Sequence, residues 1–437
     1  MIQVERLSEL TEEKRKRILE RTRLDIEKAR ESVQEIIRAV QNRGDEAVVE
    51  YTRKLDKVEL SASELRITEN EIKDAYSQIP ASLLRAMQHA ARNIERFHRF
   101  QLEGQDQEIE IQPGIKLSRV HRPIERIGIY IPGGTYPYPS TALMTIVPAR
   151  VAGVREIVVC SPPREKGMIP PAVLVSCNLA GATEIYRIGG AQAIAAMAYG
   201  TASLHKVAKI FGPGNIYITA AKILAFPDVD IDMPAGPSEV LVLADEEADP
   251  MLIAADMISQ AEHGPAGSSP AVLVTSSALL ADRVRDEICR MVKEAPNRDE
   301  IEASLNNCGA LLLADDLDDA VAFANEYAPE HLEIMLSNPE EILEKVVNAG
   351  TILLGDYSPV AAGDYATGAN HVLPTSGFAK TRGGLSIQDF TKVITLQHLS
   401  KEGLEAIRET INTLANTEHL HAHGKAIDLR FQPRNKA

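Results

Sequence analysis

The segment EIYRIGGAQAIAAMAYG (184–200) decides the class of fold. It joins a short apolar run, two glycines and an alanine-rich stretch, which predicts a strand, a tight turn and a helix. The same order recurs in KVAKIFGPGNIYITAAKILA (206–225), while IERIGIYIPGG (124–134) and REIVVCSPP (155–163) supply further strands. Strands that alternate with helices at this spacing indicate βαβ units and a parallel sheet. Ligands of such sheets bind at the carboxyl ends of the strands, where the turns Gly189–Gly190 and Gly212–Asn215 fall.

Outside this region, the pattern changes twice. The first 100 or so residues are rich in charge, and apolar side chains recur at helical spacing in 11–40 and 70–100. A second series of alternating helices and strands predicts another α/β unit between residue 237 and about 355; its segments are 251–264, 270–277, 279–294, 309–316, 317–328, 331–337 and 349–356. A glycine-rich loop follows to about 392, and then a helix with one apolar face made by Leu404, Ile407, Ile411 and Leu414.

Composition narrows the function. The 437 residues carry a net charge of −15 and no tryptophan, which disfavours nucleic acid as a partner. No stretch approaches the roughly 18 apolar residues that a membrane helix needs, and the amino terminus has no apolar signal-peptide core. Four widely spaced cysteines indicate reduced, buried thiols. We therefore expect a cytoplasmic protein.

Two pairs of polar side chains are candidates for chemistry. In SQAEHGP (259–265), Gln260 and His263 share one face near the end of a predicted helix, where an amide oxygen and an imidazole suit Zn²⁺. In YAPEHLEI (327–334), Glu330 and His331 are each plausible general bases. They are adjacent on extended chain, so they face opposite ways unless the turn bends them together. The alternatives are a capped helix end and a solvated carboxylate.

Two further groups lie nearer the carboxyl terminus. Asp364 and His371 are expected in the long glycine-rich loop, where a carboxylate suits a metal or an ammonium group, or forms a turn. In TEHLHAHGK (417–425), Glu418 is followed by three histidines at alternate positions, and spacing does not decide which of them would bind a metal. No GxGxxG motif follows any predicted strand. The residues alone thus predict an α/β enzyme with a metal site, and neither its cofactor nor its substrate.

The ordered motifs resemble those of the histidinol dehydrogenase family over essentially the whole chain. The matching strings are IGIYIPGGTYPYPS (127–140), RIGGAQAIAA (187–196), FGPGN (211–215), DMPAGPSEVLV (232–242), SQAEHGP, APEHLEI (328–334), GDYATGANHVLPT (363–375) and EHLHAH (418–423). The resemblance implies oxidation of L-histidinol through the aldehyde to L-histidine with two NAD⁺, one zinc ion per subunit, and a homodimer with shared active sites. A paralogous zinc and NAD dehydrogenase of another primary alcohol, such as a sulfonated diol, is the alternative.

The resemblance also assigns residues. It implies Gln260, His263, Asp364 and His423 as zinc ligands, the last from the partner subunit, and Glu330 and His331 as the catalytic pair. Substrate contacts are Ser238, His331, Glu418 and the zinc ligands. NAD contacts are Tyr130, Gln192 and Asn215, and His371 lies near the site with its role open.

The expected fold is α/β, with two incomplete Rossmann-like parallel-sheet domains, a helical amino-terminal segment and a carboxyl-terminal dimer arm. The expected parts are residues 1–25 as the helical segment, 26–129 with 237–384 as the domain of the metal and catalytic loops, 130–236 as the inserted NAD-binding domain, and 385–437 as the arm.

Overall fold

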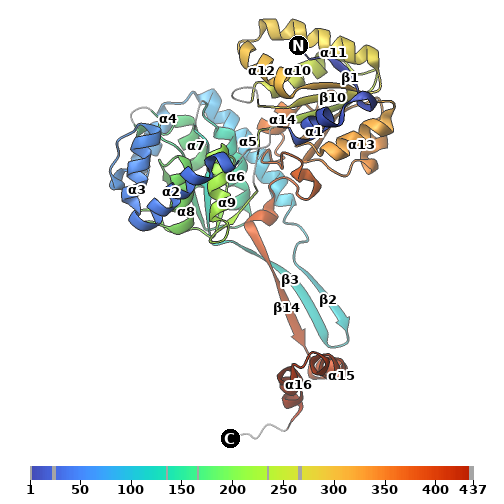
Figure 1. Ribbon diagram of the computed structural model, residues 1–437. Coiled ribbons are helices and arrows are strands. Elements are labelled where there is room, and N and C mark those ends of the chain that lie inside the picture. Colours follow the sequence, from blue (N-terminus) through green and yellow to red (C-terminus); the bar gives the residue numbers. More distant parts are fainter. Residues whose placement is uncertain are drawn as a thin grey trace. The chain divides into compact units, whose positions relative to one another are not determined.

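In this computed structural model, the chain forms two compact units, Met1–Phe100 with Ile124–Phe390 and Gln101–Pro123 with Thr391–Ala437. The structure describes residues 2–21, 26–133, 136–164, 167–233, 236–263 and 268–432. Figure 1 labels the helices and strands of both units. No helix within the described ranges combines the length and the apolar composition that a membrane crossing needs.

The segment that decided the fold lies in a five-stranded parallel sheet of order β6-β5-β4-β7-β8. The strands are β4 Arg126–Tyr130, β5 Glu156–Cys160, β6 Glu184–Tyr186, β7 Lys209–Phe211 and β8 Asp230–Ile231, joined through helices α6 Pro139–Val151, α7 Pro171–Ala180, α8 Gly190–Tyr199 and α9 Ile216–Ala225. The chain builds outward from β4 in one direction and then crosses to its other side. This is the strand order of a Rossmann half, with the switch point between β4 and β7.

The first unit contains a second parallel sheet of order β1-β11-β10-β9-β12-β13. Its strands are β1 Val4–Arg6, β9 Val240–Ala244, β10 Ala271–Thr275, β11 Ala310–Leu313, β12 His331–Met335 and β13 Thr351–Leu354. The helices that accompany it are α1 Glu12–Glu20, α10 Pro250–Ala261, α11 Ala278–Met291, α12 Arg298–Cys308, α13 Leu317–Tyr327 and α14 Val360–Tyr365. From β9 onward the strand order repeats that of the first sheet, and β1 extends the edge beyond β11. The predicted α/β class with two parallel sheets is confirmed.

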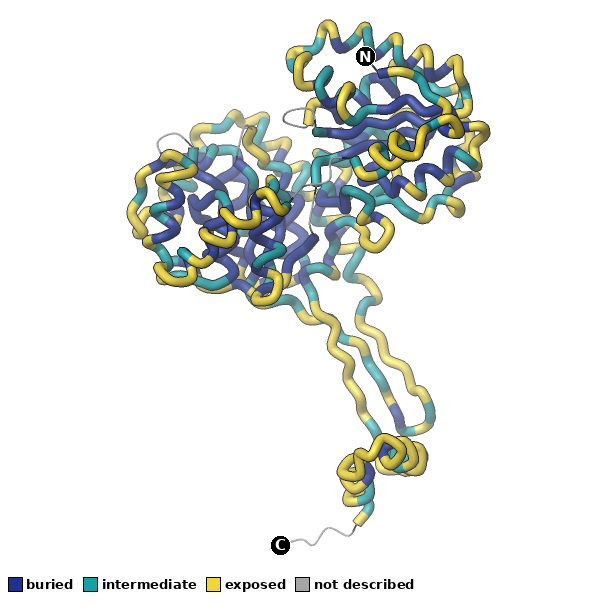
Figure 2. The backbone as a smooth tube through the Cα atoms, viewed as in Figure 1, coloured by how far each residue is buried: buried dark blue, intermediate teal, exposed yellow. Residues whose placement is uncertain are grey.

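Both sheets are buried because their strands are nearly continuous apolar runs, as expected of parallel strands covered on two faces. Successive residues of β9 alternate between two cores: Val240 and Val242 pack with α10 to α12, and Leu241 and Leu243 with α13. Figure 2 shows the central strands of both sheets as buried segments, whereas the edge strands β1 and β13 are partly exposed. Cys160, at the end of β5, and Cys177, in α7, are fully buried, as expected of thiols in a core.

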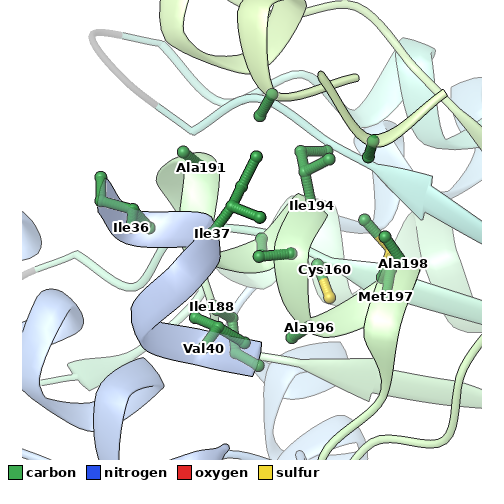
Figure 3. Close-up of a cluster of buried hydrophobic side chains, with 14 of the residues drawn as sticks. Ile36, Ile37, Val40, Cys160, Ile188, Ala191, Ile194, Ala196, Met197 and Ala198 are labelled. Carbon is green, nitrogen blue, oxygen red and sulfur yellow. The ribbon is translucent and has the colours of Figure 1, made fainter. Parts of the chain in front are cut away.

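The amino-terminal helices are α2 Glu27–Arg43, α3 Asp45–Tyr51, α4 Glu69–Ser77 and α5 Ala81–Phe100. The apolar face of α2 packs on α8 and α9, while α4 and α5 pack on α7 and α6. Figure 3 shows Ile37 and Val40 of α2 among Ile188, Ile194 and Ala196. The small side chains of α8 allow α2 to approach closely. The predicted division groups residues 26–129 with 237–384, whereas these helices pack with the elements of 130–236; the other predicted boundaries stay predictions.

The second unit contains an antiparallel sheet of order β14-β3-β2 and two helices. The elements are β2 Gln107–Gln112, β3 Ile115–Pro123, β14 Thr391–Leu399, α15 Lys401–Thr417 and α16 His421–Asp428. Residues 101–123 thus belong with the carboxyl-terminal segment, which the sequence did not predict. The predicted terminal helix is present as α15, and its apolar face remains partly open, with Leu414 exposed. Its role as a dimer arm stays a prediction.

Several short helical turns complete the described chain: η1 Leu7–Glu9, η2 Thr52–Asp56, η3 Ala62–Glu64, η5 Val292–Glu294, η6 Pro339–Lys345, η7 Phe378–Lys380, η8 Ile387–Phe390 and η9 Leu429–Phe431. Residues 356–392 were expected to be a loop. The structure corrects this prediction, because Pro359 precedes the helix α14, whose residues include Asp364. The glycines of the segment dominated its pattern and hid the short helical run.

The turn after β7 has no room for a side chain at Gly212. Its φ is +111°, and a Cβ atom there would lie 2.1 Å from the carbonyl oxygen of Tyr130. The Gly212 N–H donates to Asp232 Oδ2 at 2.8 Å, and Lys222 Nζ donates to the Gly212 carbonyl at 3.0 Å. Lys222 and Asp232 also form a buried ion pair. Lys222 and Asp232 together hold the Gly212 turn, which follows β7 and lies against the last residue of β4.

We expect Gly212→Ala to lower the free energy of unfolding by about 2–5 kcal/mol, because the methyl group meets a backbone atom and the left-handed conformation is costly for alanine. Chemical denaturation followed by circular dichroism measures the change. Gly383→Ala is the matched control, since nothing lies within 4 Å of a Cβ atom at Gly383. Equal stability of the two variants would contradict this account of the turn.

Candidate active site

The residues before β9 and β12 meet because the two strands are parallel neighbours. In their register, His331 lies opposite Val240. Ser238 and Glu239 therefore lie beside Glu330 and His331, although about 90 residues separate the two segments, as the sequence separations of 91 and 92 show. This cluster is at the amino ends of the strands, not at the carboxyl ends where ligands of parallel sheets usually bind.

Glu330 is held by reciprocal hydrogen bonds. Its Oε2 accepts from the Ser238 hydroxyl at 2.7 Å and from the Glu239 N–H at 2.8 Å. Its own N–H donates to Glu239 Oε1 at 3.2 Å. Both the carboxylate and the backbone N–H of Glu330 are thus held by hydrogen bonds. Ser238, which was predicted to contact the substrate, donates a hydrogen bond from its hydroxyl to Glu330.

His331 is oriented by the same segment. Its Nδ1 lies 3.0 Å from the carbonyl oxygen of Glu239, so Nδ1 carries the proton and Nε2 keeps a lone pair. The distance from Nδ1 to Glu330 Oε2 is 3.5 Å. The two adjacent side chains therefore do come together. Ala328, with a left-handed φ of +50°, bends the chain just before them.

Burial inverts the usual protonation of this pair. It raises the pKa of Glu330 to about 8, and the hydrogen bonds from Ser238 and Glu239 oppose this rise without cancelling it. Burial also lowers the pKa of His331, against the nearby Asp364 carboxylate. At neutral pH, Glu330 therefore holds a proton and His331 is free to accept one.

Three imidazoles surround Asp364. His263 Nε2 lies 3.7 Å from Oδ2, His331 Nε2 lies 3.9 Å from Oδ1, and His371 Nδ1 lies 4.0 Å from Oδ1. Asp364 lies in helix α14, and His263 lies two residues beyond the end of α10. The structure thus brings together His263, His331, Asp364 and His371 from four segments.

Gln260 is a buried amide, 1% exposed. Within the described ranges, neither its Oε1 nor its Nε2 has a hydrogen-bonding partner. Such a group is costly unless something else binds it. It lies three residues before His263, whose Nδ1 donates to the Ser259 carbonyl at 3.0 Å and leaves Nε2 available. An amide oxygen, an imidazole Nε2 and a carboxylate are donors that fit zinc.

The described part of the chain contains no group of three His, Cys, Asp or Glu side chains arranged to hold a metal ion. Glu418 follows α15 and His423 lies in α16, both exposed in the second unit. His419, with a φ of +58°, lies between these two helices. The roles predicted for Glu418 and His423 stay predictions.

A cavity of about 500 Å³ opens beside His263. His263 and Tyr365 line one side, and the segment Tyr136–Ser140 and helix α5 line another. Its size suits a small substrate with part of a cofactor. Because Tyr136–Ser140 follows β4, the cavity lies between His263 and the segment beyond the carboxyl end of that strand.

The predicted cofactor residues gather at that end. Tyr130 ends β4, and its hydroxyl accepts from the Gly190 N–H at 3.3 Å. Gln192 is fully buried in α8; its Nε2 donates to Asp56 Oδ2 at 3.3 Å, while Oε1 has no partner. Asn215 caps α9 by accepting from two backbone N–H groups. Gly212, against the Tyr130 carbonyl, places the Asn215 turn beside Tyr130.

Comparison with known proteins decides the family. A model of histidinol dehydrogenase matches residues 19–431. The histidinol dehydrogenase of Methanothermobacter thermautotrophicus is 48% identical over 95% of this chain and 96% of its own length.

The chain belongs to the histidinol dehydrogenase family.

The histidinol dehydrogenase of Methanosarcina barkeri is 45% identical over 99% of this chain and 98% of its own. The crystal structure of histidinol dehydrogenase from Elizabethkingia anophelis superposes with a TM-score of 0.93 at 40% identity, covering 98% of both chains. Family membership confirms the predicted class, an NAD-dependent oxidoreductase of histidine biosynthesis that acts on histidinol.

Sequence reasoning missed several buried charged residues that support this histidinol dehydrogenase site. Asp56 approaches Gln192 from η2, and burial raises its pKa to about 6. Glu239 pairs with Arg21 beneath Glu330. Glu333, on the same face of β12 as His331, accepts from the Val360 N–H at 2.9 Å and so fixes the start of α14. No local pattern signals these residues, because each acts on a segment distant in sequence.

The pH dependence of stability tests the environment of Glu333. Burial raises its pKa to about 8, with Asp256 adding to the rise. The folded state therefore binds this proton more tightly than the unfolded state, and that stabilisation is lost as the pH rises from about 4.5 to about 8. Relative to Glu333→Gln, the metal-free parent should lose up to about 1.4 kcal/mol per pH unit in this window. Denaturant titrations across it provide the measurement.

Glu340→Gln is the control for Glu333→Gln, since Glu340 is an exposed carboxylate beyond the end of β12. Parallel stability curves for Glu333→Gln and the parent would show that Glu333 is not a protonated buried acid.

Proposed function

We propose that the chain oxidises L-histidinol through L-histidinal to L-histidine and reduces two NAD⁺, with one zinc ion per subunit. The observation that carries the proposal is the Asp364 carboxylate, which lies within 4.0 Å of three imidazoles. One of these imidazoles, His331, is the unprotonated neighbour of a protonated Glu330. The cluster thus places two of the proposed metal ligands, His263 and Asp364, beside the proposed proton-transfer pair.

Gln260, His263 and Asp364 would hold the zinc ion, together with His423 of the partner subunit. The unsatisfied amide of Gln260 and the free Nε2 of His263 support this assignment. When bound, zinc supplies a Lewis acid that ligates the amine and imidazole of the substrate without changing its own oxidation state. The homodimer follows from this ligand set, because the fourth ligand comes from a second chain.

His331 accepts the proton of the carbinol hydroxyl in the first oxidation. Its Nε2 carries the lone pair because the Glu239 carbonyl fixes the proton on Nδ1. The lowered pKa of His331 keeps this lone pair available at neutral pH. Bound NAD⁺ would accept the hydride that leaves the carbinol carbon of histidinol.

Glu330 acts in the second oxidation, when water adds to the aldehyde. Its carboxylate form takes a proton from that water as the carbon–oxygen bond forms. The Ser238 hydroxyl and the Glu239 N–H hold Oε2 in place for this transfer. Because the Glu330 pKa is raised to about 8, the active form grows as the pH approaches that value.

The remaining binding roles are assigned to other residues. Tyr130, Gln192 and Asn215 would contact NAD at the carboxyl end of the first sheet; Gln192 Oε1, which has no hydrogen-bonding partner among the described residues, supports this assignment. Glu418 would attract the ammonium or imidazole group of the substrate. Two fully buried thiols, Cys160 and Cys177, are compatible with the cytoplasmic location that we also propose.

Turnover by zinc-loaded protein tests the proposed function. We expect two NADH formed per histidinol consumed, measured by absorbance together with amino-acid analysis. His331→Asn should lower kcat by about 10²–10⁴-fold while its zinc content stays unchanged, because a general base is lost and no ligand is. Asp364→Ala should lose zinc. Turnover of a sulfonated diol without turnover of histidinol would overturn the proposal.

The pH profile tests Glu330 separately. In the parent, kcat/KM for histidinol should rise with pH through a limb near 8, where Glu330 loses its proton. Glu330→Gln should remove this limb and lower the plateau, because no carboxylate forms at this position. Steady-state assays in overlapping buffers provide the measurement. A limb that persists in Glu330→Gln belongs to another group and would refute this assignment.

A further inference from the structure

Arg21 is a buried cation that the reaction described above does not use. It ends α1, and its side chain is 3% exposed. Its Nε lies 2.9 Å from Oε2 of Glu239, which is 1% exposed. Burying two charges is expensive, and such a pair is often no more stable than apolar residues would be.

The guanidinium of Arg21 also holds the turn before the catalytic pair. Nη2 donates to the carbonyl of Tyr327 and, at 3.4 Å, to that of Ala328. The guanidinium carbon lies 3.5 Å from the centre of the Tyr327 ring. Ala328 has a φ of +50°, a left-handed conformation that is strained for a residue with a side chain. Arg21 thus binds the two carbonyls that flank this strained residue.

Glu239 connects Arg21 with both catalytic side chains. Oε1 accepts from the Glu330 N–H at 3.2 Å, while the Glu239 N–H donates to the Glu330 carboxylate at 2.8 Å. The Glu239 carbonyl accepts from His331 Nδ1 at 3.0 Å. A displacement of Glu239 would therefore move the Glu330 carboxylate. It would also break the hydrogen bond that fixes the tautomer of the His331 imidazole.

We propose that Arg21 and Glu239 are positioning residues, which hold Glu330 and His331 in the geometry for proton transfer from beneath the site. The inference rests on the proposed roles of Glu330 and His331. Arg21 acts through two contacts: the ion pair with Glu239 and the carbonyls of the Ala328 turn. Neither residue is assigned contact with substrate, cofactor or metal.

The closing experiment compares Arg21→Met, Arg21→Lys and Glu239→Gln with the parent, all loaded with zinc. Methionine keeps most of the volume, and lysine keeps the charge without the planar fork. We expect kcat for histidinol to fall about 10–100-fold in Arg21→Met and Glu239→Gln, since a small misplacement of catalytic groups has effects of this size. KM should change less than about threefold, and Arg21→Lys should be intermediate.

Arg15→Met is the matched control. Arg15 also lies on α1, pairs with Glu326 of α13, and has its guanidinium carbon 5.4 Å from the centre of the Phe323 ring. These contacts involve neither Glu239 nor the Ala328 turn. It should keep kcat within about twofold, as exposed ion pairs contribute little. Equal losses in Arg15→Met and Arg21→Met would mean that α1 docking alone matters, and would overturn the proposal.

A double-mutant cycle distinguishes positioning from a general loss of structure. In a Glu330→Gln background, adding Glu239→Gln should lower kcat by a smaller factor than it does in the parent, because one of the two side chains that Glu239 positions has lost its carboxylate. A structural role would multiply the two losses instead. Full additivity, or an unchanged kcat in the single variants, would contradict the proposal.

A readout without turnover separates this inference from the proposed function. In ¹⁵N-histidine-labelled protein, the His331 Nδ1 proton, bound to the Glu239 carbonyl, should be resolved in the parent and in Arg15→Met. It should broaden or disappear in Arg21→Met. If the parent fails to oxidise histidinol but these spectra differ as stated, only the proposed function fails. If the spectra of Arg21→Met and the parent coincide, the positioning role fails.

Discussion

The active site depends on the register between β9 and β12. With His331 opposite Val240, the backbone of Glu239 reaches Glu330 and His331, and three hydrogen bonds of 2.7–3.2 Å close around the Glu330 residue. A shift of one residue would turn every side chain of the strand to the opposite face. Because both strands are buried on two sides by apolar cores, such a shift is prevented by the whole sheet. The site's geometry is therefore a consequence of packing far from the site.

The two sheets share a strand order but use opposite ends. The sheet of β4 to β8 presents glycine turns at its carboxyl end, beside Tyr130, in keeping with the usual rule. The sheet of β9 to β13 carries Glu330 and His331 at its amino end. At its carboxyl end, the Asp245 carboxylate accepts from the N–H and the hydroxyl of Ser337. The cavity beside His263 is also lined by Tyr136–Ser140, the segment that follows β4.

Local patterns in the sequence were enough for the strands, the helices and the glycine turns, because period and turn chemistry are encoded within about ten residues. They also placed Gln260 and His263 correctly near the end of a helix. They could not predict that the side chains of Glu330 and His331 lie together, because this requires the left-handed Ala328 and a partner, Glu239, beside another strand. Nor could they predict Arg21, which reaches the Tyr327 carbonyl across 306 positions. Asp364 was expected in a loop because the glycines around it hid a short helix.

The central claim is that burial at the β9–β12 junction leaves Glu330 protonated and His331 unprotonated at neutral pH. Isotope-edited infrared difference spectroscopy of the metal-free parent against metal-free Glu330→Gln measures the protonation of this one carboxyl group directly. The account predicts a protonated carboxyl band for Glu330 at neutral pH, which is converted to a carboxylate band with a midpoint near 8. A carboxylate band that is already complete at neutral pH would contradict the account.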